Sequence, residues 1–137
     1  MLWGFINIFV ALNGFYDIIC AFSILLCLTW RVPVFLSMSV LHANMFKEEE
    51  HKTHPVIMRF LAYWLLTYGT VRLVSGLSSF FGCSGICAFA ALTYFIEAIC
   101  FAYELVVGKT MIPQKVFFVS ILSGGLGLLV LYAGFHV

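Results

Sequence analysis

The chain has 137 residues, of which 64% are hydrophobic and only 9% are charged. Soluble domains carry about 25% charged residues, so this composition excludes a soluble globular protein and indicates one that lies in a membrane. The net charge of +1 gives no indication of nucleic-acid binding.

Four apolar stretches predict four membrane-spanning helices, because a spanning helix needs roughly 20 mostly apolar residues. The expected spans are residues 2–30, 55–80, 86–107 and 114–137. The one sizeable connection, 31–54, has an apolar half suited to the membrane interface and a polar half, KEEEHKTH. Short connections place successive helices antiparallel. The predicted fold is therefore all-α, a four-transmembrane-helix antiparallel bundle that forms a single membrane domain over residues 1–137.

The basic residues of the connections predict the orientation of the bundle. The first and third connections carry Lys and Arg, whereas the second connection and both ends of the chain carry none. Basic loops stay on the cytosolic side, or on the matrix side in a mitochondrion. We therefore expect both ends of the chain on the opposite side.

Charged residues deep within the predicted spans are Asp17, Arg59, Arg72, Glu97 and Glu104, and charges in such positions are costly and face the bundle interior or a wet cavity. At about 1.5 Å per residue, Asp17 and Glu97 lie roughly 20–25 Å from the side bearing the chain ends, and Arg72 lies about 15 Å from it. This predicts that Arg72 pairs with Glu97, with Asp17, or with both. Arg59 and Glu104 fall at similar depths near the opposite boundary, which favours a second pair. The pairs either fix helix register or line a proton or ion path.

The fourth predicted span carries small residues at close spacing. Ser120 with Gly124, and Ser123 with Gly127, form small-x-x-x-small pairs, which allow another helix to approach closely. That helix belongs either to this bundle or to a partner protein.

The sequence offers no pattern for a cofactor, a metal ion or catalysis. The five cysteines form no C-x-x-C pair and read as small buried hydrophobic residues. The histidines lie outside the spans or at the end of the chain, so they cannot hold a membrane haem. No nucleophile, base and orienting residue can be assembled. We expect no cofactor and no enzymatic activity of the chain by itself.

A resemblance to a known family starts in the second predicted span. Arg59, Trp64 and Arg72 give the pattern R-x4-W-x7-R, and Glu104 opens the string ELVVGKT at the end of the third span. These motifs, with FYDI at residues 15–18, resemble the sterol C-4 demethylation scaffold family, the four-span ergosterol-biosynthesis proteins of the endoplasmic reticulum. The family often has a histidine where this chain has Cys100, and Glu97 has no evident counterpart. The resemblance implies a non-enzymatic scaffold that tethers sterol-modifying enzymes to the membrane.

Three functions remain open from the sequence. The first is this scaffold in the endoplasmic reticulum, with membrane lipids and other integral membrane proteins, sterol-modifying enzymes among them, as partners. The second is an accessory subunit of an organellar complex of respiration, ATP synthesis or photosynthesis, for which the mitochondrial inner membrane is the expected location. The third is a small proton- or ion-coupled transporter that uses Asp17, Arg72 and Glu97.

Overall fold

A computed structural model describes residues 2–26, 44–48, 54–78 and 86–135 of the chain. The described part is helical: α1 spans Leu2–Leu25, α4 spans Pro55–Ser78, α5 spans Ile86–Tyr103, and α6 spans Pro113–Phe135. A short π-helical segment, η3 (Glu104–Gly108), continues α5. The all-α class and the order of the helices follow the sequence prediction. The first helix is shorter than predicted, because it ends at Leu25 and Leu26 lies in a turn.

Three of the helices, α1, α5 together with η3, and α6, are long and apolar enough to cross a membrane. The chain is therefore a multi-pass membrane protein. The helix α4 has 24 residues but is not among these three, since it carries Arg59 and Arg72 and several hydroxyl side chains. The predicted fourth span is thus a helix of sufficient length whose composition alone does not establish a crossing.

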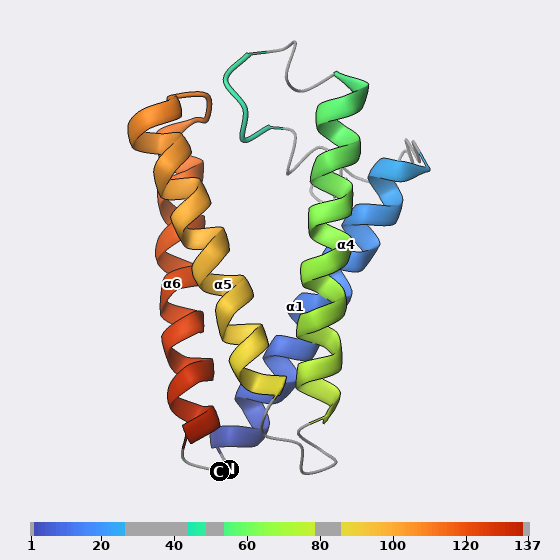
Figure 1. The fold of residues 1–137 in the computed structure, drawn as a ribbon, viewed down its shortest axis with the longest axis vertical. Helices are drawn as coiled ribbons and strands as arrows, with labels where there is room; N and C mark the ends of the chain where they lie inside the picture. Colours follow the sequence, from blue (N-terminus) through green and yellow to red (C-terminus); the bar gives the residue numbers. More distant parts are fainter. Residues whose placement is uncertain (1, 27–43, 49–53, 79–85, 136–137) are drawn as a thin grey trace.

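The four helices pack as two pairs, α1 with α4 and α5 with α6 (Figure 1). The pairs meet mainly where α4 contacts α5. The beginning of α1 and the end of α6 lie at the same end of the bundle (Figure 1). From there the pairs diverge toward the other end, which carries the connection between α5 and α6.

The α1–α4 pair owes its closeness to glycines. A Cβ atom on Gly69 would lie 2.7 Å from the carbonyl oxygen of Gly14, and one on Gly76 would lie 2.6 Å from the backbone nitrogen of Ala11. A Cβ on Gly14 would in turn clash with the backbone of Leu73. The two backbones therefore touch, as small residues allow where lipid gives helices no hydrophobic reason to associate.

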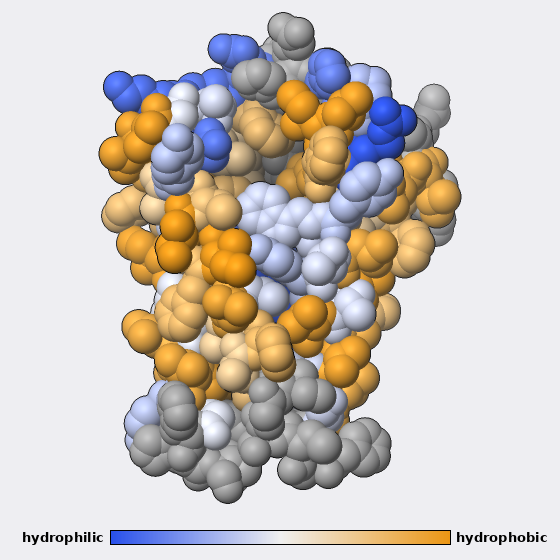
Figure 2. All heavy atoms as spheres, in the orientation of Figure 1, coloured by the Kyte–Doolittle hydropathy of each residue, from blue (hydrophilic) through white to orange (hydrophobic). Residues whose placement is uncertain are grey.

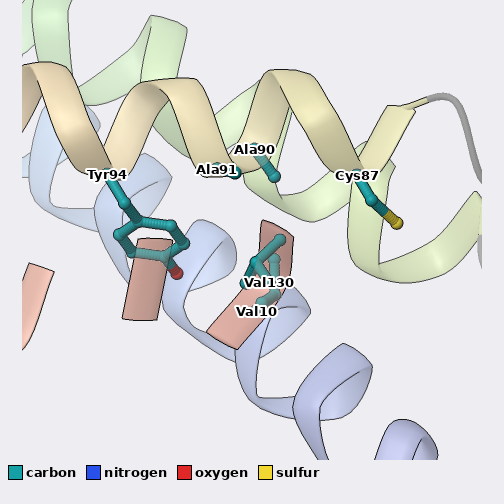
Figure 3. Packing of buried hydrophobic residues seen from close by; sticks show 6 residues of the cluster. All are labelled: Val10, Cys87, Ala90, Ala91, Tyr94 and Val130. Atoms are coloured by element: carbon teal, nitrogen blue, oxygen red, sulfur yellow. The ribbon is translucent and has the colours of Figure 1, made fainter. Parts of the chain in front are cut away.

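The buried side chains form three clusters that follow this divergence. One cluster, at the end with the chain termini, joins α1, α5 and α6 (Figure 3) and consists of Val10, Cys87, Ala90, Ala91, Tyr94 and Val130. Farther up, each pair has a core of its own. That of α1 and α4 is Cys20, Ala21, Ile24, Ala62 and Leu65, and that of α5 and α6 is Phe101, Met111 and Val116. The bundle is closed at one end and divided at the other.

The two basic connections lie together at the divided end. Phe46 and Met111 form an antiparallel β-bridge, with hydrogen bonds from Lys47 N to Thr110 O (2.8 Å) and from Ile112 N to Met45 O (2.8 Å). The Lys115 ammonium group donates to the carbonyl oxygen of Asn44 (3.0 Å). Hydrophilic residues gather at this end in Figure 2. Most of the interfacial segment predicted within residues 31–54, and the turn between α4 and α5, lie outside the described residues.

The outer surface of the bundle is apolar on every helix. Large hydrophobic side chains are exposed on α1, α4, α5 and α6, for example Phe5, Phe60, Ile99 and Phe118. Figure 2 shows such residues along both flanks of the molecule, with weakly hydrophilic ones gathered between them. This is the surface expected of a protein whose solvent is lipid.

Candidate functional site: a buried arginine at the floor of a cavity

Arg72 lies at the centre of the described polar interactions between helices. Its side chain is 2% exposed, and all three guanidinium nitrogens donate hydrogen bonds. Nε donates to Thr93 Oγ1 (3.1 Å), Nη1 to Asp17 Oδ2 (2.7 Å), and Nη2 to Glu97 Oε2. The cation thus joins three helices, because Asp17 belongs to α1 whereas Thr93 and Glu97 belong to α5.

The glycine contact between α1 and α4 positions the first half of this site. Asp17 lies three residues after Gly14, and Arg72 lies three residues after Gly69, so each shares a helix face with its glycine. A Cβ on Gly69 would lie 2.9 Å from the Cβ of Asp17, and one on Gly14 would lie 2.9 Å from the Cβ of Arg72. The absence of side chains at the two glycines therefore brings the carboxylate and the guanidinium within contact distance.

One face of α5 supplies the remaining side chains of the site. Thr93 and Glu97 are four residues apart and lie on one face, and the Thr93 hydroxyl is fixed by donating to the carbonyl oxygen of Ala90 (2.7 Å). The ring of Tyr94 covers the guanidinium, with its centroid 3.9 Å from Arg72 Cζ. Tyr68 of α4 lies farther away, at 5.6 Å. Two aromatic faces thus add cation–π attraction to the hydrogen bonds.

The arginine has two acidic partners rather than one. If both are ionised, the cluster holds one positive and two negative charges in a largely buried part of the molecule. Buried ion pairs rarely stabilise a fold over an apolar packing of the same shape, but losing one partner is costly because the other is left unpaired. The cluster therefore requires all of its members in place.

A cavity of about 660 Å³ opens above this cluster, between the two helix pairs. Arg72, Asp17 and Glu97 line its inner end, whereas Asn44, Gln114 and Lys115 line it at the divided end of the bundle. The wall between is largely aromatic or aliphatic: Tyr16, Leu61, Trp64, Leu65, Tyr68, Tyr94, Phe101, Phe118, Val119, Leu122 and Leu126. Each pair has its own core at this level, which explains why the space between them is unfilled.

The structure does not bring Arg59 and Glu104 together. Arg59 is exposed at the beginning of α4, and Glu104 instead accepts a hydrogen bond from Thr110 Oγ1 (2.5 Å). No ion pair joins the two among the described residues. The physical reason is the divergence of the pairs, which separates the beginning of α4 from the end of α5 (Figure 1). Arg59 and Glu104 have similar depths along their helices, but the two helices are far apart at that level.

The small-residue face of α6 turns largely toward α5. Gly127 is buried, and a Cβ on it would lie 3.0 Å from the ring of Phe95. Ser123 is buried as well, and a Cβ on Gly124 would meet Ala98 at 3.9 Å. Ser120 holds its hydroxyl oxygen buried without a hydrogen-bond partner in the described part of the chain. Gly125, which belongs to neither of the two small-x-x-x-small pairs, has nothing within 4 Å of its Cβ position.

Sequence reasoning missed the glycines of the α1–α4 contact and the roles of Thr93 and Tyr94. Gly14 and Gly69 each precede a charged residue by three positions, and this shared spacing was a usable signal. Thr93 and Tyr94 lie four and three positions before Glu97, which places them near its face. Trp64, noted only as a motif residue, lines the cavity and stacks on Phe101 with ring centroids 5.8 Å apart.

The family comparison decides where the chain belongs. A family model described as "Erg28 like protein" matches residues 6–128. The chain belongs to the Erg28-like family. No curated protein and no solved structure matched it. The match confirms the resemblance carried by Arg59, Trp64 and Arg72. In this Erg28-like chain the three lie in different surroundings, since Arg59 is exposed, Trp64 lines the cavity, and Arg72 is buried among carboxylates.

Proposed function

We propose that this protein is a non-catalytic scaffold of the endoplasmic reticulum membrane that tethers membrane-bound enzymes of sterol biosynthesis. The observation that carries the proposal is membership of the Erg28-like family over residues 6–128. The form of the molecule supports it, since the described chain consists of helices with apolar outer surfaces and the bridged parts of two connections. A protein of this form contacts its partners laterally, through helix surfaces within the membrane.

The proposal includes a fourth span formed by α4. Three observations support it. The helix lies against α1 along its length, it exposes Phe60, Val74 and Leu77 to the surroundings, and its one deeply buried charge, Arg72, meets two carboxylates. A neutralised arginine that faces the bundle costs far less in a bilayer than one that faces lipid. Four crossings also suit two chain ends that lie at the same end of the bundle (Figure 1).

This topology gives a testable prediction. The bridged basic connections around Lys47 and Lys109 should face the cytosol, and both ends of the chain should face the lumen. We expect an Asn-x-Ser/Thr acceptor sequence appended through a spacer to either end to be glycosylated. The same acceptor inserted after Glu48 should stay unmodified, and glycosylation there instead would contradict the proposed orientation.

Partners are expected on the outer face of α6, where Gly125 leaves a small open site among exposed Ile121, Leu122 and Leu128. We predict that Gly125→Leu lowers the yield of co-purified sterol enzymes several-fold while the amount of inserted protein stays constant. The matched variant Gly127→Leu should instead lower protein abundance, because its side chain enters the ring of Phe95. Affinity purification in mild detergent and quantification of both proteins measure the two effects. Unchanged partner yield with Gly125→Leu would place the docking surface elsewhere.

Two measurements test the scaffold proposal itself. A tagged copy should co-localise with reticulum markers and co-purify with sterol-modifying enzymes. Co-localisation with mitochondrial markers and recovery of respiratory or ATP synthase subunits would favour the accessory-subunit function. Turnover of a sterol by the purified protein alone would overturn the non-catalytic role.

A proton- or ion-coupled transporter is the second candidate, and the lining of the cavity by Asp17, Arg72 and Glu97 favours it. The packed cluster of Val10, Tyr94 and Val130 closes the bundle beyond these charges. A transporter would have to open that cluster. Flux across proteoliposomes containing the purified protein measures this directly, and a flux abolished by Glu97→Gln would establish it.

A further inference from the structure

The cavity has an apolar body and one deep polar end, which is the form of a site for an amphipathic small molecule. Its volume of about 660 Å³ falls within the roughly 300–1,000 Å³ of small-molecule pockets. Aromatic rings of three helices, Trp64, Tyr68, Phe101 and Phe118 among them, form much of its wall. Flat rings and branched aliphatic chains suit a rigid, apolar ligand.

One buried polar atom in this wall lacks a partner. Tyr94 is 1% exposed, and its hydroxyl oxygen makes no hydrogen bond with the described residues. Buried tyrosine hydroxyls normally have a partner, because an unsatisfied one costs the desolvation of the group. Tyr94 lines the cavity, and Figure 3 shows its hydroxyl directed away from α5, on the side where Val10 and Val130 lie. A ligand in the cavity can supply what this hydroxyl lacks.

A hydrogen-bond acceptor accompanies this donor. Glu97 lies three residues after Tyr94 on α5, so the two share a helix face, and both line the cavity. Glu97 uses Oε2 for Arg72, and a carboxylate has a second oxygen that can accept a proton donor. The inner end of the cavity therefore offers one donor and one acceptor, the pair that a single alcohol group needs.

The charges at the inner end of the cavity disfavour an anionic headgroup there. Each guanidinium nitrogen of Arg72 already donates to a side chain of the protein, and the two carboxylates beside it repel a phosphate. The lining residues Phe118 and Leu122 are also exposed on the outside of α6. The wall of the cavity is thus continuous with the lipid-facing surface, so a ligand can come from the bilayer.

We propose that the cavity binds a sterol alcohol, with its ring system between the two helix pairs and its hydroxyl group between Tyr94 and Glu97. The ligand hydroxyl accepts from the Tyr94 hydroxyl and donates to the Glu97 carboxylate. The choice of a sterol rests on the proposed function in sterol biosynthesis, whereas the rigid apolar body and the single alcohol follow from the cavity. The scaffold then holds the substrate class of its partner enzymes as well as the enzymes themselves.

The test uses the purified full-length protein and a photoreactive sterol with a free 3-hydroxyl group. We expect saturable labelling that an unlabelled sterol alcohol competes away and that its 3-methyl ether and phosphatidylcholine do not. Tyr94→Phe keeps the ring on Arg72 and removes only the hydroxyl, so the apparent Kd should rise about five- to tenfold, the effect of one hydrogen bond. Tyr103→Phe is the matched control, since Tyr103 is exposed on the same helix and should leave labelling unchanged.

The remaining outcomes are equally decisive. Equal labelling of wild type and Tyr94→Phe, or equal competition by phosphatidylcholine, would overturn the sterol site. Co-purification of sterol enzymes is measured on the same variants. Enzymes recovered without sterol labelling would refute this inference and leave the scaffold, whereas labelling without enzymes would refute the scaffold alone.

Discussion

Replacing Arg72 by leucine should strongly lower the amount of this protein in the membrane. The substitution leaves the Asp17 and Glu97 carboxylates facing each other without the cation that now bonds to both. Breaking a buried pair in this way costs about 3–5 kcal/mol in soluble proteins, and membranes soften the value. A loss of this size is a large part of the stability of a small domain. Abundance after membrane extraction and thermal unfolding in detergent both measure the effect.

Two further variants identify the cause. Adding Asp17→Asn and Glu97→Gln to Arg72→Leu removes the orphaned charges, so it should restore part of the abundance. Arg59→Leu deletes an arginine from the same helix, but that side chain is exposed, and abundance should stay near that of the wild type. Wild-type abundance of Arg72→Leu by itself would contradict the role of the cluster in holding the bundle together.

Alanine at Gly14 or Gly69 should separate α1 from α4 and destabilise the bundle by more than the roughly 1–3 kcal/mol that ordinary overpacking costs. The added methyl group would meet backbone atoms of the facing helix, at 2.6 Å for Gly14 against Gly69 O and 2.7 Å for Gly69 against Gly14 O. Backbone cannot move aside as a flexible side chain does. The shift would also pull Asp17 from Arg72, so both effects act together.

Gly125→Ala is the matched control, because its Cβ position on α6 is open. Replacing glycine by alanine within a helix favours the helix by roughly 0.5–1 kcal/mol, so this variant should be as stable as the wild type or slightly more stable. Thermal unfolding midpoints of the three variants in one detergent make the comparison. Equal midpoints for Gly14→Ala and Gly125→Ala would show that the two helices are less closely packed than described.

The elements were predictable from the sequence, whereas their lateral arrangement was predictable only in part. Runs of apolar residues indicated where the helices lie. Counting depth from one membrane face placed Arg72 close enough to the levels of Asp17 and Glu97 for its long side chain to reach them. The same count wrongly joined Arg59 to Glu104, because depth contains no information about divergence between helices. That divergence depends on which helices pack closely, as α1 and α4 do at Gly14 and Gly69, and such contacts join residues far apart in the sequence.

The residues of the candidate site were likewise predictable from the sequence only in part. Its charged members stood out because charges are rare in apolar helices, whereas Thr93, Tyr94 and Gly14 are ordinary residues of such helices. The small residues of α6 were conspicuous, but a pattern of glycines does not say which neighbour they face. The structure answers this for Gly127, which faces Phe95, and for Gly125, which faces outward.

The pairing of neighbouring helices has a consequence for how the protein is made. Because α1 and α4 are consecutive helices of the described chain, Asp17 can meet Arg72 as soon as the first hairpin forms, before α5 and α6 have been synthesised. In the proposed four-span topology, the hairpin enters the bilayer with its arginine already matched by one carboxylate. Glu97 joins later, when the second hairpin docks against the first. Biogenesis thus never has to leave this arginine alone in lipid.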